Sequence, residues 1–283
     1  DGFLALGTTT VEAKSGYGLS TESELRSLEA IRKAGLAHPL EFVPTFLGAH
    51  EIPDEWRHDP AAYLRLLCDE MLPEVARRGL ATACDVFCEK GVFSIDDSRT
   101  LLKRAQELGL KVKLHADELF PTGSAELAAE LGALSADHLV HVSDEGMTRM
   151  REKGVVPILL PATSFFIKLK QDAPGAEMVK RGLAVALATD FNPGSSPTRS
   201  LPLVMTFACV KYGMTPAEAL TAATVNAAHA IGMGDRIGIL KAGYQADLVA
   251  WDLENHRQLP YRFGENFAAI VVKKGAVAVD RRR

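Results

Sequence analysis

The feature that most constrains the fold is a regular alternation of short apolar runs with helical patterns. Seven runs rich in apolar and β-branched residues begin at positions 8, 41, 81, 111, 136, 155 and 184, so that consecutive starts lie 19 to 40 residues apart. Six of the intervening helices are predicted to stop at a glycine just before the next run, the first of them, over 22–34, at Gly35. Repeats of this length predict parallel βα units.

Seven such units fit either a doubly wound sheet or a (β/α)8 TIM-type barrel. No G-x-G-x-x-G follows the first run, which disfavours the dinucleotide-binding version of the doubly wound sheet. The barrel is therefore the preferred interpretation, although seven strands are one short of closing it. We accordingly expect an α/β barrel whose first strand is missing from this chain.

The pattern changes after the seventh run. Helices are predicted over 201–212 and 216–231, and short alternating runs at 246–252, 267–273 and 276–280 indicate strands of a small second sheet. The chain is therefore expected to contain two domains. Residues 1–235 would form the barrel, with strands two to eight, and residues 236–283 would supply the C-terminal part of a small β-sandwich.

Composition restricts the classes of function. The 283 residues are 47% hydrophobic and carry a formal net charge of only −4, which argues against disorder and against a nucleic-acid partner. No apolar run is long enough to span a membrane, and the start does not resemble a signal peptide. The four cysteines are too scattered for a disulfide framework. A cytoplasmic protein that acts on a small molecule is the expectation.

Polar residues recur where the predicted strands end, which is where (β/α)8 barrels carry their active sites. His115 ends the fourth strand, His138 lies on the fifth, and Asp190 follows the seventh. Imidazole and carboxylate groups suit Zn²⁺ or a similar ion, so His115 and Asp190 are predicted metal ligands. Glu118 is placed to exchange protons with a metal-bound water, and His138 to polarise the group under attack.

A second set of residues is predicted to hold the substrate. Asn192, Gly194 and Ser195 would supply amide, backbone N–H and hydroxyl donors for a carboxylate arm, and Tyr17 and His50 would face a planar ring. Simpler alternatives remain open, since 192–194 can be an ordinary turn and Tyr17 an aromatic packed on the rim. Two ligands also do not complete a metal site, and no H-x-H pair occurs in the sequence.

Five segments together resemble the amidohydrolase superfamily and, within it, the imidazolonepropionase family. A sixth, IGILKAGYQADLVAWD (237–252), resembles the superfamily's return to its β-sandwich. The combination of KSGYGL, HADE and TDFNPGSSP is the specific part of the resemblance. The five segments are TTTVEAKSGYGLSTESELRSLEAIR (8–32), FLGAHEIPDEW (46–56), KLHADELF (113–120), SADHLVH (135–141) and ATDFNPGSSPT (188–198).

The resemblance implies a (β/α)8 barrel with one Zn or Fe ion at its mouth. It also implies hydrolysis of 4-imidazolone-5-propanoate to N-formimidoyl-L-glutamate in histidine degradation, by a cytoplasmic homodimer. By position, His115 and Asp190 match metal ligands and Glu118 matches the acid/base that also contacts the substrate. His138 matches the histidine that activates the ring carbonyl. The residues that match the family's substrate-binding positions are Tyr17, His50, Asn192, Gly194 and Ser195.

The chain departs from the family at its front. Family members carry an H-x-H pair and a substrate-binding Arg upstream of the KSGYGL segment, and here the chain opens just before that segment. We therefore expect a C-terminal portion of such an enzyme, which alone need not be active. Two rivals remain: another amidohydrolase, such as a deaminase or cyclic-amide hydrolase, and a catalytically incomplete fragment that acts only as a scaffold.

Overall fold

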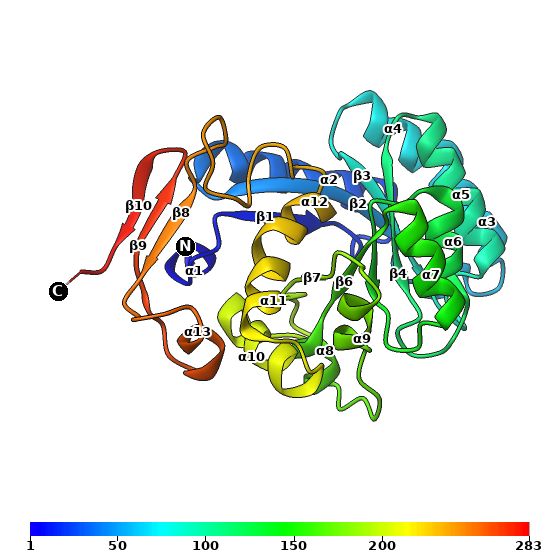
Figure 1. Ribbon diagram of the computed structural model, residues 1–283. Helices are drawn as coiled ribbons and strands as arrows, with labels where there is room; N and C mark the ends of the chain where they lie inside the picture. Colours follow the sequence, from blue (N-terminus) through cyan, green and yellow to red (C-terminus); the bar gives the residue numbers. More distant parts are fainter. Residues whose placement is uncertain (283) are drawn as a thin grey trace. The chain divides into compact units, whose positions relative to one another are not determined.

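The computed structural model describes residues 1–282 and divides into two compact units (Figure 1). The first unit is Val11–Val155, and the second combines Asp1–Thr10 with Val156–Arg283. Arg283, the last residue of the predicted C-terminal domain, lies outside the described residues. The domain boundary expected between residues 235 and 236 stays a prediction.

The first unit is built on five strands that follow one another in chain order. Neighbours from β2 to β5 pair in parallel, and the register places His115 beside Phe87 on one side and beside Asp137 on the other. The strands are β1 (Thr10–Lys14), β2 (Glu41–Ala49), β3 (Ala83–Cys88), β4 (Lys111–Ala116) and β5 (Ser135–His138).

Helices join these strands, and α5 and α6 pack against β3 and β4 (Figure 1). Helix α5 shows why the sequence folds this way. Ser94 caps its N-terminus in a reciprocal pair with Asp97, and Leu101 and Leu102 point inward, fully buried. Burying a leucine contributes about 1.5–3 kcal/mol. The helices are α2 (Thr21–Ala37), η1 (Asp54–Trp56), α3 (Pro60–Leu66), the π-helical η2 (Leu67–Met71), α4 (Leu72–Arg77), α5 (Ile95–Glu107), α6 (Ser124–Leu131) and α7 (Asp144–Lys153).

Glycine stops are confirmed at four of these helices and wrong at another. Gly132 and Gly154 end α6 and α7 in the left-handed conformation, and Gly79 and Gly109, with φ angles of 58° and 83°, follow the C-caps of α4 and α5. The predicted stop at Gly35 does not occur, because α2 continues to Ala37. It ends at His38, which precedes Pro39 and is extended, as the residue before a proline prefers.

The second unit contains two parallel strands, β6 and β7, and a three-stranded antiparallel sheet in the order β10-β9-β8. The three predicted late strands therefore form, and they pair with one another. The elements are α1 (Gly2–Ala5), β6 (Val156–Leu159), α8 (Pro161–Phe166), α9 (Gly175–Lys180), β7 (Ala186–Leu187), α10 (Leu201–Lys211), α11 (Pro216–Thr221), the π-helical η3 (Ala222–Asn226), α12 (Ala227–Ala230), β8 (Leu248–Trp251), α13 (Gln258–Tyr261), β9 (Ala268–Lys273) and β10 (Ala276–Asp280).

The alternation of β1 to β7 with helices is that of a TIM-type barrel, so the predicted α/β class is confirmed. The strand predicted over 136–142 is too long, because the chain turns at His138 and Leu139, which have φ angles of 75° and 58°. Helices α1, α8 and α13 were not predicted. No helix within residues 1–282 is long and apolar enough to cross a membrane.

Candidate active site

Five residues predicted for the site lie in the first unit, and contacts connect them one to the next. The ring of Tyr17 lies 4.8 Å from that of His50, measured between centroids. The His50 ring is 6.1 Å from that of His115, which in turn is 5.2 Å from that of His138. The Nδ1 atom of His138 lies 3.3 Å from a carboxylate oxygen of Glu118. The first unit thus brings together residues that are 121 positions apart in the sequence.

The pair formed by Glu118 and His138 is buried and held by unusual backbone. His138 and Asp117, the residue before Glu118, have positive φ angles of 75° and 48°. Such a conformation costs a non-glycine residue of the order of 1 kcal/mol and persists only where the surroundings fix it. Asp117 is fixed in this way, because its carboxylate accepts hydrogen bonds from a run of backbone N–H groups, those of Thr122, Gly123, Ser124 and Ala125.

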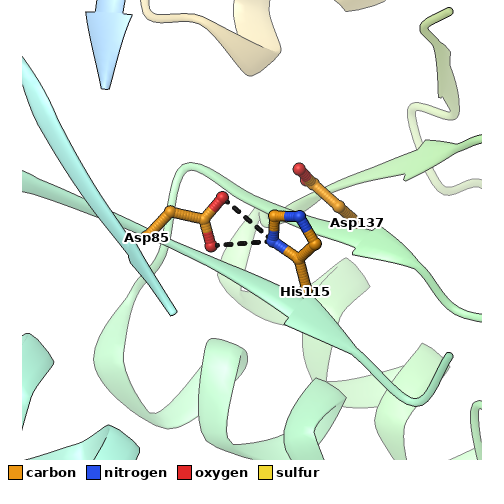
Figure 2. Close-up of side chains that lie close together, drawn as sticks. All are labelled: Asp85, His115 and Asp137. Atoms are coloured by element: carbon orange, nitrogen blue, oxygen red, sulfur yellow. Dashed lines mark hydrogen bonds and ion pairs between the residues drawn. The ribbon is translucent and has the colours of Figure 1, made fainter. Parts of the chain in front are cut away.

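A residue that sequence reasoning did not select, Asp85 on β3, faces His115. Both carboxylate oxygens of Asp85 lie 3.2 Å from the Nδ1 atom of His115 (Figure 2). One ligand atom each from Asp85, His115 and Asp137 lies within 4.8 Å of the others, and all three residues are buried. By residue type this cluster resembles a metal site.

Lys14, at the end of β1, places a positive charge between the carboxylates of Asp85 and Asp137. Its Nζ atom donates to Asp85 at 2.5 Å and to Asp137 at 2.6 Å. The ammonium therefore already lies between the two carboxylates that a metal ion would have to bridge. Further along the same strands, Lys113 forms a second buried ion pair with Glu12 at 2.8 Å.

This arrangement shifts the pKa of each group in the cluster. Burial raises the pKa of the Asp85 carboxyl, but the charges of Lys14 and His115 outweigh it and hold that pKa below its usual value. The pKa of Asp137 is lowered in the same way, chiefly by Lys14. Burial lowers the pKa of His115, and the opposing charge of Asp85 more than compensates, so that this pKa lies above 6.5.

His115 has the features of a histidine that binds a metal through Nε2. A carboxylate only accepts hydrogen bonds, so the Nδ1 atom facing Asp85 carries the proton and Nε2 keeps its lone pair. Within residues 1–282, Nε2 has no hydrogen-bond partner. A carboxylate on the second ring nitrogen is the usual support of a metal-ligating histidine.

The other predicted residues lie in the second unit, in the segment after β7. Asp190 has a φ angle of 49°, and its carboxylate accepts a hydrogen bond of 2.7 Å from the hydroxyl of Thr163. The side-chain oxygen of Asn192 accepts from the backbone N–H groups of Gly194 and Ser195, at 2.9 and 2.7 Å. Residues 192–195 therefore form a turn in which the Asn192 side-chain oxygen already accepts from the backbone N–H groups of Gly194 and Ser195.

The predicted residues thus form two groups, one in each unit. The group in the first unit consists of Tyr17, His50, His115, Glu118 and His138. The group in the second unit consists of Asp190, Asn192, Gly194 and Ser195. The shared binding of one ion by His115 and the second group stays a prediction.

Sequence reasoning missed the charged residues inside the first unit, notably Lys14, Asp85 and Asp137. One signal could have found them. Glu12 and Lys14, like Lys113 and His115, are two positions apart on one strand and therefore share a face. Charged residues on the same face as a candidate ligand inside a barrel indicate a network rather than solvent exposure.

Residues 98–278 match the amidohydrolase family. The chain is 55% identical over 280 residues to an imidazolonepropionase of Geobacillus kaustophilus and 47% identical over 283 residues to one of Alkaliphilus metalliredigens. These alignments cover 99% and 100% of this chain, but 66% and 67% of the relatives. The chain therefore spans about two thirds of the length of the curated relatives that it matches.

Solved structures support the fold. A 5-methylcytosine deaminase from Klebsiella pneumoniae matches all of this chain with a TM-score of 0.79 at 18% identity, over 74% of its own length. An adenosine deaminase from Xanthomonas campestris with bound zinc matches 99% of this chain with a TM-score of 0.73 at 21% identity, over 67% of its own length. The family match over 98–278 and the identity to the curated relatives show that the chain belongs to the amidohydrolase family and, by its sequence, to the imidazolonepropionases within it.

Proposed function

We propose that this protein is an imidazolonepropionase, which hydrolyses the cyclic C–N bond of 4-imidazolone-5-propanoate to give N-formimidoyl-L-glutamate. The observation that carries the proposal is the 55% identity to a curated imidazolonepropionase across 99% of the chain. The proposal is also supported by the cluster of Tyr17, His50, His115, His138 and Glu118. Its aromatic rings and hydrogen-bonding groups suit a planar, polar ring. In this role the enzyme would serve histidine degradation.

The residues fit one bound metal ion, Zn or Fe. We propose that His115 holds it through Nε2, which the contact of Nδ1 with Asp85 leaves available, and that Asp190 is a second ligand. Nitrogen and oxygen donors of this kind suit either metal. When bound, the ion would lower the pKa of a coordinated water towards about 7 and so supply hydroxide at neutral pH.

Glu118 is proposed to move the proton, and His138 to stabilise the charge that develops on the carbonyl oxygen. The Glu118 carboxylate takes a proton from the attacking water and delivers it to the ring nitrogen that leaves when the C–N bond breaks. His138 donates a hydrogen bond to the carbonyl oxygen, on which negative charge develops. The distance of 3.3 Å between the two side chains supports a shared role, because each fixes the orientation of the other.

The remaining residues are proposed to bind the substrate. Tyr17 and His50, with ring centroids 4.8 Å apart, would contact the imidazolone ring. Asn192, Gly194 and Ser195 would hold the propanoate carboxylate. Because the Asn192 side chain occupies the N–H groups of the other two residues, the substrate carboxylate would have to replace Asn192 Oδ1 as their acceptor. Each N–H group would then gain a charged acceptor in place of a neutral one.

Location and assembly are also proposed from the family. A cytoplasmic homodimer is the form we expect from the family, and all four cysteines are free thiols. The substrate is a small molecule, and the mild net charge of −4 gives no indication of a nucleic-acid partner.

The test is a substrate comparison with the protein expressed from its complete reading frame. We expect turnover of imidazolone propanoate, its loss on treatment with a chelator, and its return when Zn or Fe is added. Guanine, cytosine and hydantoins serve as matched substrates for the rival amidohydrolases. Turnover of one of these in place of imidazolone propanoate, or no turnover of any, would contradict the proposal.

A further inference from the structure

We infer that Asp85 is a positioning residue, which keeps the proton of His115 on Nδ1 and thereby presents the Nε2 lone pair to the metal ion. The inference rests on the proposed function, because it takes His115 as a metal ligand. It adds a residue from a strand that the sequence motifs do not include. It also gives a role to Lys14, as the group that holds Asp85 in place.

Three donors converge on the Asp85 side chain. Lys14 donates its ammonium to Oδ2 at 2.5 Å, and the backbone N–H of Val86 donates to Oδ1 at 2.7 Å. The third is His115, whose Nδ1 atom lies 3.2 Å from both oxygens. Only a side chain with two acceptor atoms can accept from all three donors, and an ionised carboxylate is such a group.

The carboxylate is also fixed in position. Asp85 is fully buried, and Lys14 ties it to Asp137 on β5 by a second contact of 2.6 Å. Figure 2 shows that Asp85 and His115 face each other from different strands, while Asp137 lies on the far side of the imidazole ring. Because Lys14 is charged and cannot accept, Asp85 cannot turn away from it without breaking one of the two short ion pairs of this ammonium.

Replacing the carboxylate by an isosteric amide tests this directly. Whichever way the Asn amide turns in Asp85→Asn, its NH2 group lies about where an oxygen stood, within hydrogen-bond reach of Nδ1. An NH2 group there needs an acceptor, and of the three neighbours only the imidazole can become one. The proton of His115 should therefore move to Nε2, which then lacks the lone pair for a metal.

The first readout is the tautomer of His115, measured by two-bond ¹⁵N–¹H correlation spectra of histidine-labelled, metal-free protein at a pH where the ring is neutral. Loss of one ring signal in His115→Gln assigns it among the eight histidines. We expect the proton on Nδ1 in the wild type and on Nε2 in Asp85→Asn. A proton on Nε2 in the wild type, or an unchanged tautomer in the variant, would overturn the inference.

The second readout is metal affinity, measured by competition with a chromophoric zinc chelator. Losing such a partner of a ligating histidine weakens binding about 10–100-fold, and we expect a loss in this range. Asp247→Asn is the matched control, since Asp247 also accepts from a lysine, Lys273 at 2.6 Å, from a backbone N–H, that of Lys274 at 2.9 Å, and from one further side chain. An equal loss of affinity in both variants would show that Asp85 acts only through stability.

Zinc binding by the variants distinguishes a failure of the positioning role from a failure of the proposed function. If wild type and His115→Gln bind zinc equally well, His115 is no ligand and the proposed function is wrong, whatever the tautomer. If His115→Gln loses zinc but Asp85→Asn keeps it, only the positioning role is wrong. Should Asp85→Asn not fold, the tautomer of the wild-type protein decides, because the inference requires the proton on Nδ1 there and a proton on Nε2 would overturn it.

Discussion

Replacing Lys14 by methionine removes the positive charge that two buried carboxylates share. Lys14 contacts Asp85 and Asp137 at 2.5 and 2.6 Å, and the side chains of those residues are 0% and 4% exposed. Breaking a buried ion pair by removing one partner costs about 3–5 kcal/mol, because the other charge stays in the interior. With two carboxylates deprived of their shared ammonium, we expect a loss of about 5 kcal/mol, a large part of the 5–15 kcal/mol that typically stabilises a domain.

The assay is urea unfolding at neutral pH, followed by circular dichroism, for Lys14→Met and for Lys273→Met as a control. Lys273 pairs with the buried carboxylate of Asp247, and its replacement leaves that carboxylate without its ammonium, which should cost less, about 3 kcal/mol. Adding Asp137→Asn to Lys14→Met should recover at least about 1 kcal/mol, since it removes one of the uncompensated charges.

Two outcomes would refute this reasoning. One is a cost below about 1 kcal/mol for Lys14→Met, the size typical of a solvent-exposed pair. The other is a further loss of stability when Asp137→Asn is added, because the cost would then come from lost packing rather than from buried charge. If Lys14→Met is insoluble, recovery of soluble protein by Asp137→Asn is the same test.

Three further predictions concern the site and the thiols. Asp190→Ala should lower kcat/KM at least about 10³-fold in initial-rate assays, since it removes a metal ligand, and activity within tenfold of wild type would contradict its role. Asn192→Ala should raise KM more than it lowers kcat, because the turn that presents Gly194 and Ser195 loses its internal hydrogen bonds; an unchanged KM would contradict substrate binding there. Burial raises the pKa of the Cys88 thiol to about 11, so the unfolded state loses that proton first as pH rises, and the free energy of unfolding should fall between about pH 9 and 11. Urea titrations at pH 8 and 10 measure this fall, which should be smaller in Cys88→Ala; an equal fall in the variant would refute the assignment.

Much of the fold could be predicted because the strand and helix signals are local. The helix over 144–153 begins and ends where expected, since Ser143 caps its start and Gly154 its end, and both signals lie within the segment itself. The strand that should have run to Val142 ends at His138, because the chain there adopts a left-handed backbone that a histidine rarely takes. In that conformation His138 contacts Glu118, which is distant in the sequence, so no local pattern predicts the contact.

The candidate site could be predicted only in part, for a related reason. Residues with evident chemistry at strand ends, such as His115 and Glu118, were selected and do come together with Tyr17 and His50 in the first unit. Asp85 was not, because it lies inside an apolar run and its role depends on the pairing of β3 with β4. Strand order, rather than residue type, makes it a neighbour of His115.

The most direct test of the central claim is a crystal structure of the metal-loaded protein, from its complete reading frame, with the ion located by anomalous scattering. We expect one ion bonded to Nε2 of His115 at about 2.0–2.1 Å and to a carboxylate oxygen of Asp190, with Lys14 still between Asp85 and Asp137. An ion bound by Asp85 and Asp137 in place of the Lys14 ammonium, or one that contacts only one of His115 and Asp190, would contradict the proposed hydrolytic site.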